Sequence, residues 1–93
     1  MARYKYKKTG DTVEAGQFLP DRLRGEWPRG ICTVPHDGSA GPAAAHIHMP
    51  SGAVVPVQAS WWVAQDLDGR MTGVEGQWFQ ISPEYFPEAY EPA

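Results

Sequence analysis

Short runs of alternating apolar and polar residues, separated by glycine and proline, dominate this chain. Nine prolines and ten glycines divide the 93 residues so often that an amphipathic helix of ordinary length does not fit between them. The intervening runs favour extended structure, because alternation with a period of two places every second side chain on one face of a strand. We expect strands at residues 4–7, 12–18, 31–34, 45–49, 53–57, 61–64 and 77–81.

Turn chemistry links these runs into hairpins. Residues 8–11, 50–52 and 66–69 combine glycine with polar residues or proline, as turns require. Asp66 and Asp68 are interpreted as solvated residues of the last of these turns. Residues 19–25 and 83–86 are each expected to form one helical turn, the second capped by Ser82 and stopped by Pro87. The sequence predicts a mainly β (α+β) fold: a single domain, residues 1–93, built on a small antiparallel sheet or a partly open barrel.

Two tryptophans are the first candidates for a surface site. Adjacent side chains on a strand point to opposite faces, so Trp61 and Trp62 cannot both enter a one-sided core. A strand running straight from Val55 would turn Trp62 outward, and the same alternation turns Trp78 outward. The two could form an exposed aromatic patch, which often marks an interface. The alternative is that the C-terminal helical turn folds over them as a second layer.

Composition and charge narrow the class of protein. The chain has 42% hydrophobic residues and no long apolar run, so we expect neither a membrane span nor a membrane partner. Its first residues do not resemble a secretory signal, and a single cysteine suits a reducing compartment. Seven of the eight basic residues lie in residues 1–30, whereas residues 66–93 carry six acids. This asymmetry suits antiparallel pairing of the two ends or a dipolar surface, and direct binding of nucleic acid is not expected.

Chemistry-bearing side chains are few. His46 and His48 lie two apart on a predicted strand, and Cys32 and His36 could add ligands for tetrahedral zinc. Their spacing matches no zinc signature, so they are only weak metal candidates and we expect no cofactor. The chain has no glycine-rich phosphate loop and no nucleophile–base motif, and we therefore expect it not to be an enzyme.

Both ends of the chain resemble a family of small tailed-phage and prophage proteins. The N-terminal YKYKKTGDTVEAGQF is similar to that family's opening, YRKKPVVVEAVQW, and GQWFQISPEYFPEAYEP keeps the spacing of its closing GEFYPCKPDIFEATYEP. The resemblance covers about half of the chain. Gln58-Ala59-Ser60 stands where the family has a Pro-Gly-Asp turn, and a turn there would break the register that faces Trp62 outward.

The resemblance implies a small β-rich phage or prophage protein acting in the cytoplasm of the bacterial host. The family is of unassigned function, so the resemblance assigns no catalytic residues, and small phage accessory proteins commonly bind host proteins. We therefore expect binding to a host protein or complex, with inhibition of an antiviral defence such as CRISPR-Cas as one form. The candidate surface is Trp62, Trp78, Glu84, Glu88 and Glu91. Three alternatives remain open: a module that sequesters a small nucleotide signal, a minor structural component of the virion, and a homodimer.

Overall fold

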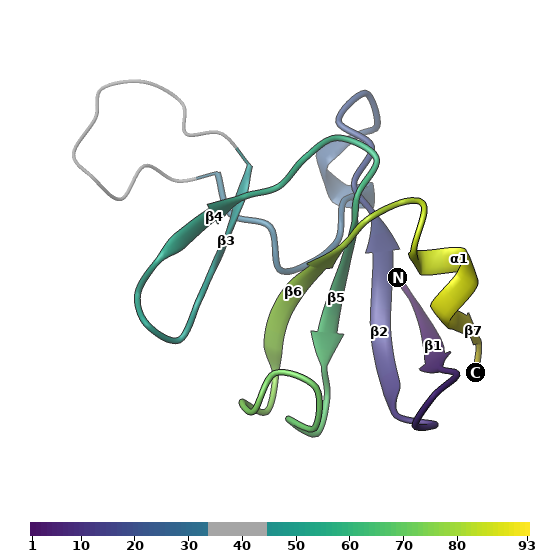
Figure 1. Cartoon of the computed structure of the whole chain (residues 1–93). Coiled ribbons are helices and arrows are strands. Elements are labelled where there is room, and N and C mark those ends of the chain that lie inside the picture. The colour runs from purple at the N-terminus through teal and green to yellow at the C-terminus, as the bar shows by residue number, and fades with distance from the viewer. Residues whose placement is uncertain (34–44) are drawn as a thin grey trace.

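Seven short strands and two short helical segments make up the described part of the chain. The computed structural model describes residues 1–33 and 45–93 (Figure 1). Its elements are β1 (Ala2–Tyr6), β2 (Thr12–Gln17), the 3-10 turn η1 (Arg24–Glu26), β3 (His46–His48), β4 (Val54–Pro56), β5 (Trp62–Asp66), β6 (Gln77–Ile81), α1 (Phe86–Ala89) and β7 (Tyr90–Pro92). The predicted mainly β fold is confirmed.

Five of the strands form one antiparallel sheet with the order β6-β5-β2-β1-β7. The hairpin β3-β4 forms a second, two-stranded sheet beside it (Figure 1). Within the described residues the edges of the larger sheet, β6 and β7, do not pair with each other, so the sheet is open. Of the two predicted forms, an antiparallel sheet or a partly open barrel, the structure has the antiparallel sheet.

The two ends of the chain pair in this sheet. β1 and β7 run antiparallel, with Lys5 opposite Glu91, and the charged ends of these side chains lie 3.4 Å apart. Of the two arrangements that the charge asymmetry suits, antiparallel pairing of the ends is the one observed. β7 itself was not among the expected strands, because its three residues contain no run long enough to show alternation.

Apolar clusters cover both faces of the five-stranded sheet. One cluster, here the α1-side core, joins the sheet to α1 and contains Val13, Ala15, Ala64, Ile81, Phe86, Ala89 and Tyr90. The other, here the hairpin-side core, contains Phe18, Ile47, Val57 and Val63, with Trp27 and Trp78 packed against it. Successive residues of β5 are consequently buried on opposite faces.

The C-terminal helix begins later than the pattern predicts. The hydroxyl of Ser82 accepts a hydrogen bond from the backbone N–H of Tyr85 at 3.2 Å, so Ser82 does cap a turn. The α-helix then runs over Phe86–Ala89, and Pro87 lies in its first turn instead of stopping it. Proline is tolerated there, because the N–H that it lacks would have no helical acceptor.

Two other local predictions need correction. The helical turn expected over residues 19–25 is instead a 3-10 turn at Arg24–Glu26, where the Glu26 carboxylate accepts a hydrogen bond from the N–H of Leu23. Of the strand expected at residues 31–34, the described part contains only a bridge between Cys32 and His46.

Among the described residues, no helix has the length and apolar character needed to span a membrane.

Candidate functional site

Trp62 belongs to the α1-side core. Its ring stacks on Phe86 with centroids 3.9 Å apart and planes 6° apart, and it meets the edge of Tyr4 at 5.7 Å. The C-terminal helix thus covers Trp62, which was the alternative to an exposed patch.

Trp78 lies on the opposite face of the sheet and packs against the hairpin-side core. Gly30 sits directly on its indole, since a Cβ atom added to Gly30 would come within 2.2 Å of the ring. A glycine is required here because any side chain would displace the tryptophan.

The expected patch of Trp62 and Trp78 is therefore not formed. Trp62 pairs with Ile81 in the β5-β6 register, whereas Trp78 pairs with Gln65, and these two pairs point to opposite faces. The prediction assumed a core on only one face and a straight strand from Val55. Instead, Ser60 has a positive φ of 72° and turns the chain ahead of β5. A turn at Gln58-Ala59-Ser60, which would break the register that faces Trp62 outward, is therefore present.

The three predicted acidic residues fall into two groups. Glu84 and Glu88 are exposed on either side of Tyr85 in the sequence, at the start of α1. Glu91 is on β7 and is paired with Lys5. Only Glu84 and Glu88 remain available beside an aromatic surface.

That aromatic surface is an open cleft on the α1 side of the sheet, here called the aromatic cleft. Its volume is about 580 Å³. Apolar and aromatic side chains provide most of its walls: Tyr6, Trp61, Met71, Phe79, Ile81, Tyr85 and Tyr90. Polar groups at its rim are Thr9, Asp11, Arg70, Gln80 and Ser82. Pockets of this size, mainly apolar with a few polar groups, are typical ligand sites.

Strand register explains why distant residues meet in this cleft. Tyr6 of β1 lies opposite Tyr90 of β7, and both share a face of the sheet with Phe79 and Ile81 of β6. Tyr85 reaches over from the segment before α1, and its hydroxyl lies 3.1 Å from that of Tyr6.

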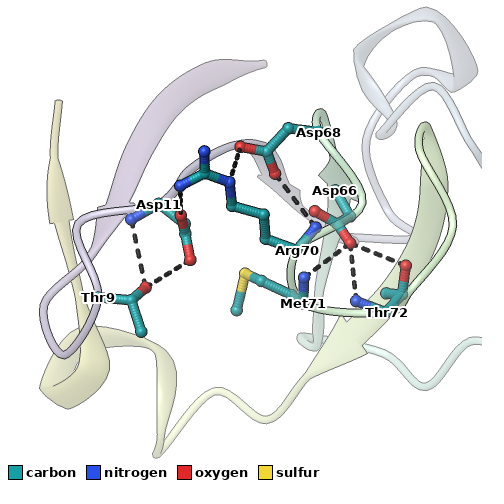
Figure 2. A network of polar contacts seen from close by, with 7 residues as sticks. All are labelled: Thr9, Asp11, Asp66, Asp68, Arg70, Met71 and Thr72. Carbon is teal, nitrogen blue, oxygen red and sulfur yellow. Dashed lines mark hydrogen bonds and ion pairs between the residues drawn. The ribbon is translucent and has the colours of Figure 1, made fainter.

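An ion-pair network forms one end of the cleft. Figure 2 shows Arg70 between two carboxylates: one guanidinium nitrogen lies 3.4 Å from Asp11, and another lies 3.4 Å from Asp68. Thr9 donates a hydrogen bond to Asp11 at 2.7 Å. The Arg70 side chain is still 71% exposed, so its charge is neutralised locally but remains accessible.

Asp66 holds the loop that carries Arg70. One carboxylate oxygen accepts hydrogen bonds from the N–H groups of Met71 and Thr72 and from the Thr72 hydroxyl, at 3.0, 2.7 and 2.8 Å (Figure 2). The residue is fully buried, so the interpretation of Asp66 as a solvated turn residue is wrong. Burial by itself raises the pKa of Asp66, but hydrogen bonds from Thr72, Met71 and Gly69 outweigh it and the net pKa lies below its ordinary value.

Two tyrosines of the cleft, Tyr85 and Tyr90, have raised pKa values that favour the neutral phenol. Burial, together with the nearby Tyr6, Tyr85 and Asp66, raises the pKa of Tyr90 to about 12. The hydrogen bond with Tyr6 raises the pKa of Tyr85; Lys8 opposes this shift and Glu88 adds to it. Tyr85 and Tyr90 therefore offer neutral phenol rings, and Glu88 and Lys8 are close enough to Tyr85 to influence it.

Three of the four weak metal candidates meet at the β3-β4 hairpin. The potential ligand atoms of Cys32, His46 and His48 all lie within 4.8 Å of one another. His46 is buried, Cys32 is half-buried and His48 is exposed. His36 lies outside the described residues.

Sequence reasoning did not nominate most residues of the aromatic cleft. Tyr6, Phe79, Tyr85 and Arg70 are not among the predicted surface residues, and the alternation that faces Trp62 outward faces Trp61 inward. The mixture of aromatic and polar residues over 77–85 could have indicated a binding site. Only the pairing of β1 with β7 in the folded chain, however, shows that Tyr6 and Tyr90 lie opposite each other.

Comparison with known proteins adds no family to this description. No family model, no curated protein and no solved structure matches the chain.

Proposed function

We propose that this chain is a non-enzymatic accessory protein that binds a macromolecule of a bacterial host through the aromatic cleft. The partner's contact is a protein segment that bears lysine or arginine. The observation that carries this proposal is an open aromatic cleft whose exposed Tyr85 has the exposed carboxylates Glu84 and Glu88 beside it in the chain. The phage or prophage origin and the cytoplasmic setting rest on the resemblance of the two chain ends to the phage family.

The aromatic rings supply the first part of the recognition. A lysine ammonium or arginine guanidinium over the face of a tyrosine or tryptophan ring gains roughly 0.5–2 kcal/mol, depending on desolvation. Tyr6, Trp61, Tyr85 and Tyr90 all line the cleft. Tyr85 is 43% exposed, although large aromatic side chains are usually covered, so it offers an accessible ring to a partner.

Charge supplies the second part. Asp11 and Asp68 lie at one end of the cleft, and Glu84 and Glu88 flank Tyr85. Arg70 is already paired with the first two, which leaves the acidic residues beside Tyr85 to attract a cationic partner. Such complementarity mainly increases the association rate and selects the partner.

A basic protein surface is the kind of target that nucleic-acid-binding defence complexes carry. An inhibitor that occupies such a surface would block the target's access to nucleic acid. Inhibition of a defence complex such as CRISPR-Cas is therefore one form of the proposed function, and it needs no catalytic group in this chain.

Affinity capture with matched variants tests the proposal. We expect the tagged wild-type protein to retain a bacterial protein. Tyr85→Ala and the double variant Glu84→Gln/Glu88→Gln should each retain at least about tenfold less of it, which corresponds to a loss of about 1.4 kcal/mol of binding free energy. Leu23→Ala is the matched control, because Leu23 is 78% exposed and does not line the aromatic cleft. Equal retention by all four proteins would contradict the proposal.

A small-ligand module that sequesters a nucleotide signal is the second candidate, because the cleft volume of about 580 Å³ suits a small molecule. Arg70→Ala separates the two functions by the sign of its effect. Removing the cation frees Asp11 and Asp68 and is expected to strengthen binding of a basic segment. It would instead weaken binding of a phosphate-bearing ligand, for which Arg70 would be the counter-ion.

A further inference from the structure

A backbone bridge places Cys32 and His46 side by side. The N–H of Cys32 donates to the carbonyl of His46 at 2.8 Å, and the N–H of His46 donates to the carbonyl of Cys32 at 3.0 Å. Two residues that exchange both hydrogen bonds in an antiparallel pair lie directly opposite each other, and their side chains share a face. The thiol of Cys32 and the imidazole of His46 therefore project to the same side.

His48 joins them through strand alternation. It lies two residues after His46 on β3, so its side chain is on the same face, and the two imidazole rings are 5.0 Å apart between centroids. Ile47 points the other way, is only 1% exposed and packs in the hairpin-side core. The buried Ile47 fixes β3, and with it the direction of both histidines.

The three side chains bring donors of the kind that zinc prefers. One thiolate sulfur and two imidazole nitrogens suit a borderline-soft divalent ion, whereas Mg²⁺ and Ca²⁺ require oxygen ligands. Bond lengths of about 2.0–2.3 Å put the ligand atoms of tetrahedral zinc roughly 3.3–3.6 Å apart. The three potential ligand atoms already lie within 4.8 Å of one another, so small side-chain rotations would close the site.

We propose that Cys32, His46 and His48 form a Zn²⁺ site to which the described residues contribute these three ligands. The ion ties the backbone around Cys32 to the β3-β4 hairpin. This hairpin supplies Ile47 and, just after β4, Val57 to the hairpin-side core. The site is separate from the aromatic cleft, whose lining contains none of its three ligands, and it does not depend on the proposed partner.

Metal titration of the full chain tests this site. The protein is prepared without a polyhistidine tag, treated with a chelator, kept reduced with a non-thiol reductant and titrated with ZnCl₂ and CoCl₂. We expect one ion per chain, a higher midpoint of thermal unfolding in zinc, and a sulfur-to-cobalt charge-transfer absorption together with tetrahedral visible bands. No saturable binding at micromolar zinc would overturn the proposal.

Two ligand variants assign the ion to these residues. Cys32→Ser should abolish the sulfur-to-cobalt absorption. Loss of an outer-shell partner lowers metal affinity roughly 10–100-fold. His48→Ala removes a direct ligand and should lower the zinc affinity by more than that. His48 is exposed, so its variant should fold, and circular dichroism checks both. Gln58→Ala is the control, since Gln58 is exposed and is not one of the three ligands. Unchanged binding in both ligand variants would show that zinc binds elsewhere and would refute the site.

Discussion

Asp66 is a buried carboxylate that fixes the shape of the loop between β5 and β6. Its three hydrogen bonds from Met71 and Thr72 replace the water that it loses on burial. Because Arg70 lies next to Met71 on this loop, Asp66 also sets the position of the cation at the end of the aromatic cleft. A single buried acid thus links the stability of the sheet to the geometry of the site.

Replacing Asp66 with asparagine is expected to destabilise the protein by about 1–3 kcal/mol at neutral pH, because a neutral amide accepts these hydrogen bonds less strongly. The folded pKa of Asp66 is lowered by its hydrogen bonds. The stabilisation is therefore present above the unfolded pKa of about 3.9 and is lost as the pH falls through the folded pKa. Urea unfolding at several pH values measures it.

The half-exposed Asp68 provides the control for that experiment. Asp68→Asn should change the free energy of unfolding by less than about 1 kcal/mol, as is usual for an exposed ion pair. The role of Asp66 would be contradicted if the difference in free energy of unfolding between wild type and Asp66→Asn did not change with pH, down to strongly acidic conditions.

The packing of Gly30 against Trp78 allows a second test at the scale of single residues. Its α-carbon lies against the ring of Trp78, so Gly30→Ala should force the indole to move and cost about 1–3 kcal/mol, as overpacked cores do. Gly25→Ala is the matched control, because a Cβ atom there meets nothing within 4 Å. Thermal unfolding with tryptophan fluorescence measures both; equal stability of the two variants would contradict the packing.

At the scale of elements, the C-terminal helix is short and depends on its packing. α1 has four residues, too few to be stable alone, and Phe86 and Ala89 anchor it to the sheet. The stack of Phe86 on Trp62 joins the helix to β5. The covered Trp62 is therefore part of what holds α1 in place.

Pro87 tests where this helix begins. If Pro87 lies in the first turn, as the structure has it, Pro87→Ala should change the stability by less than about 1 kcal/mol, since no helical hydrogen bond is gained or lost. Ala89→Pro, in the last turn, removes the hydrogen bond from the N–H of Ala89 to the carbonyl of Tyr85 and should cost about 3 kcal/mol or more. Chemical denaturation compares the two; similar losses would contradict the position of α1.

Most elements could be predicted from the sequence because local signals define them. The strand at Gln77–Ile81 and the hairpin around residues 50–52 follow from alternation and turn chemistry. β7 could not be predicted, because it exists through its pairing with β1 and not through its own pattern. Of the strand expected at residues 31–34, the described residues 31–33 contain a single bridge, from Cys32 to His46, because strand formation depends on pairing as well as on propensity.

For the whole molecule, the covering of both sheet faces is the decisive feature. A sequence that alternates suggests one buried face, but here α1 covers one face and the β3-β4 hairpin covers the other. This arrangement buries the two tryptophans of the expected patch on opposite sides. It leaves the aromatic cleft as the candidate site. The cleft is built from five separate segments of the chain, and such a site has no contiguous sequence signal.

The most direct test of the proposed function is an NMR titration of the wild-type protein with a short arginine- and lysine-bearing peptide. An acidic peptide of equal length and a nucleotide serve as comparison ligands. If the proposed function is right, the basic peptide alone shifts amide signals, only of residues around Tyr6, Trp61, Phe79 and Tyr85, and it binds more tightly to Arg70→Ala. No response of the cleft to the basic peptide at millimolar concentration, or a response to the nucleotide that Arg70→Ala weakens, would contradict it.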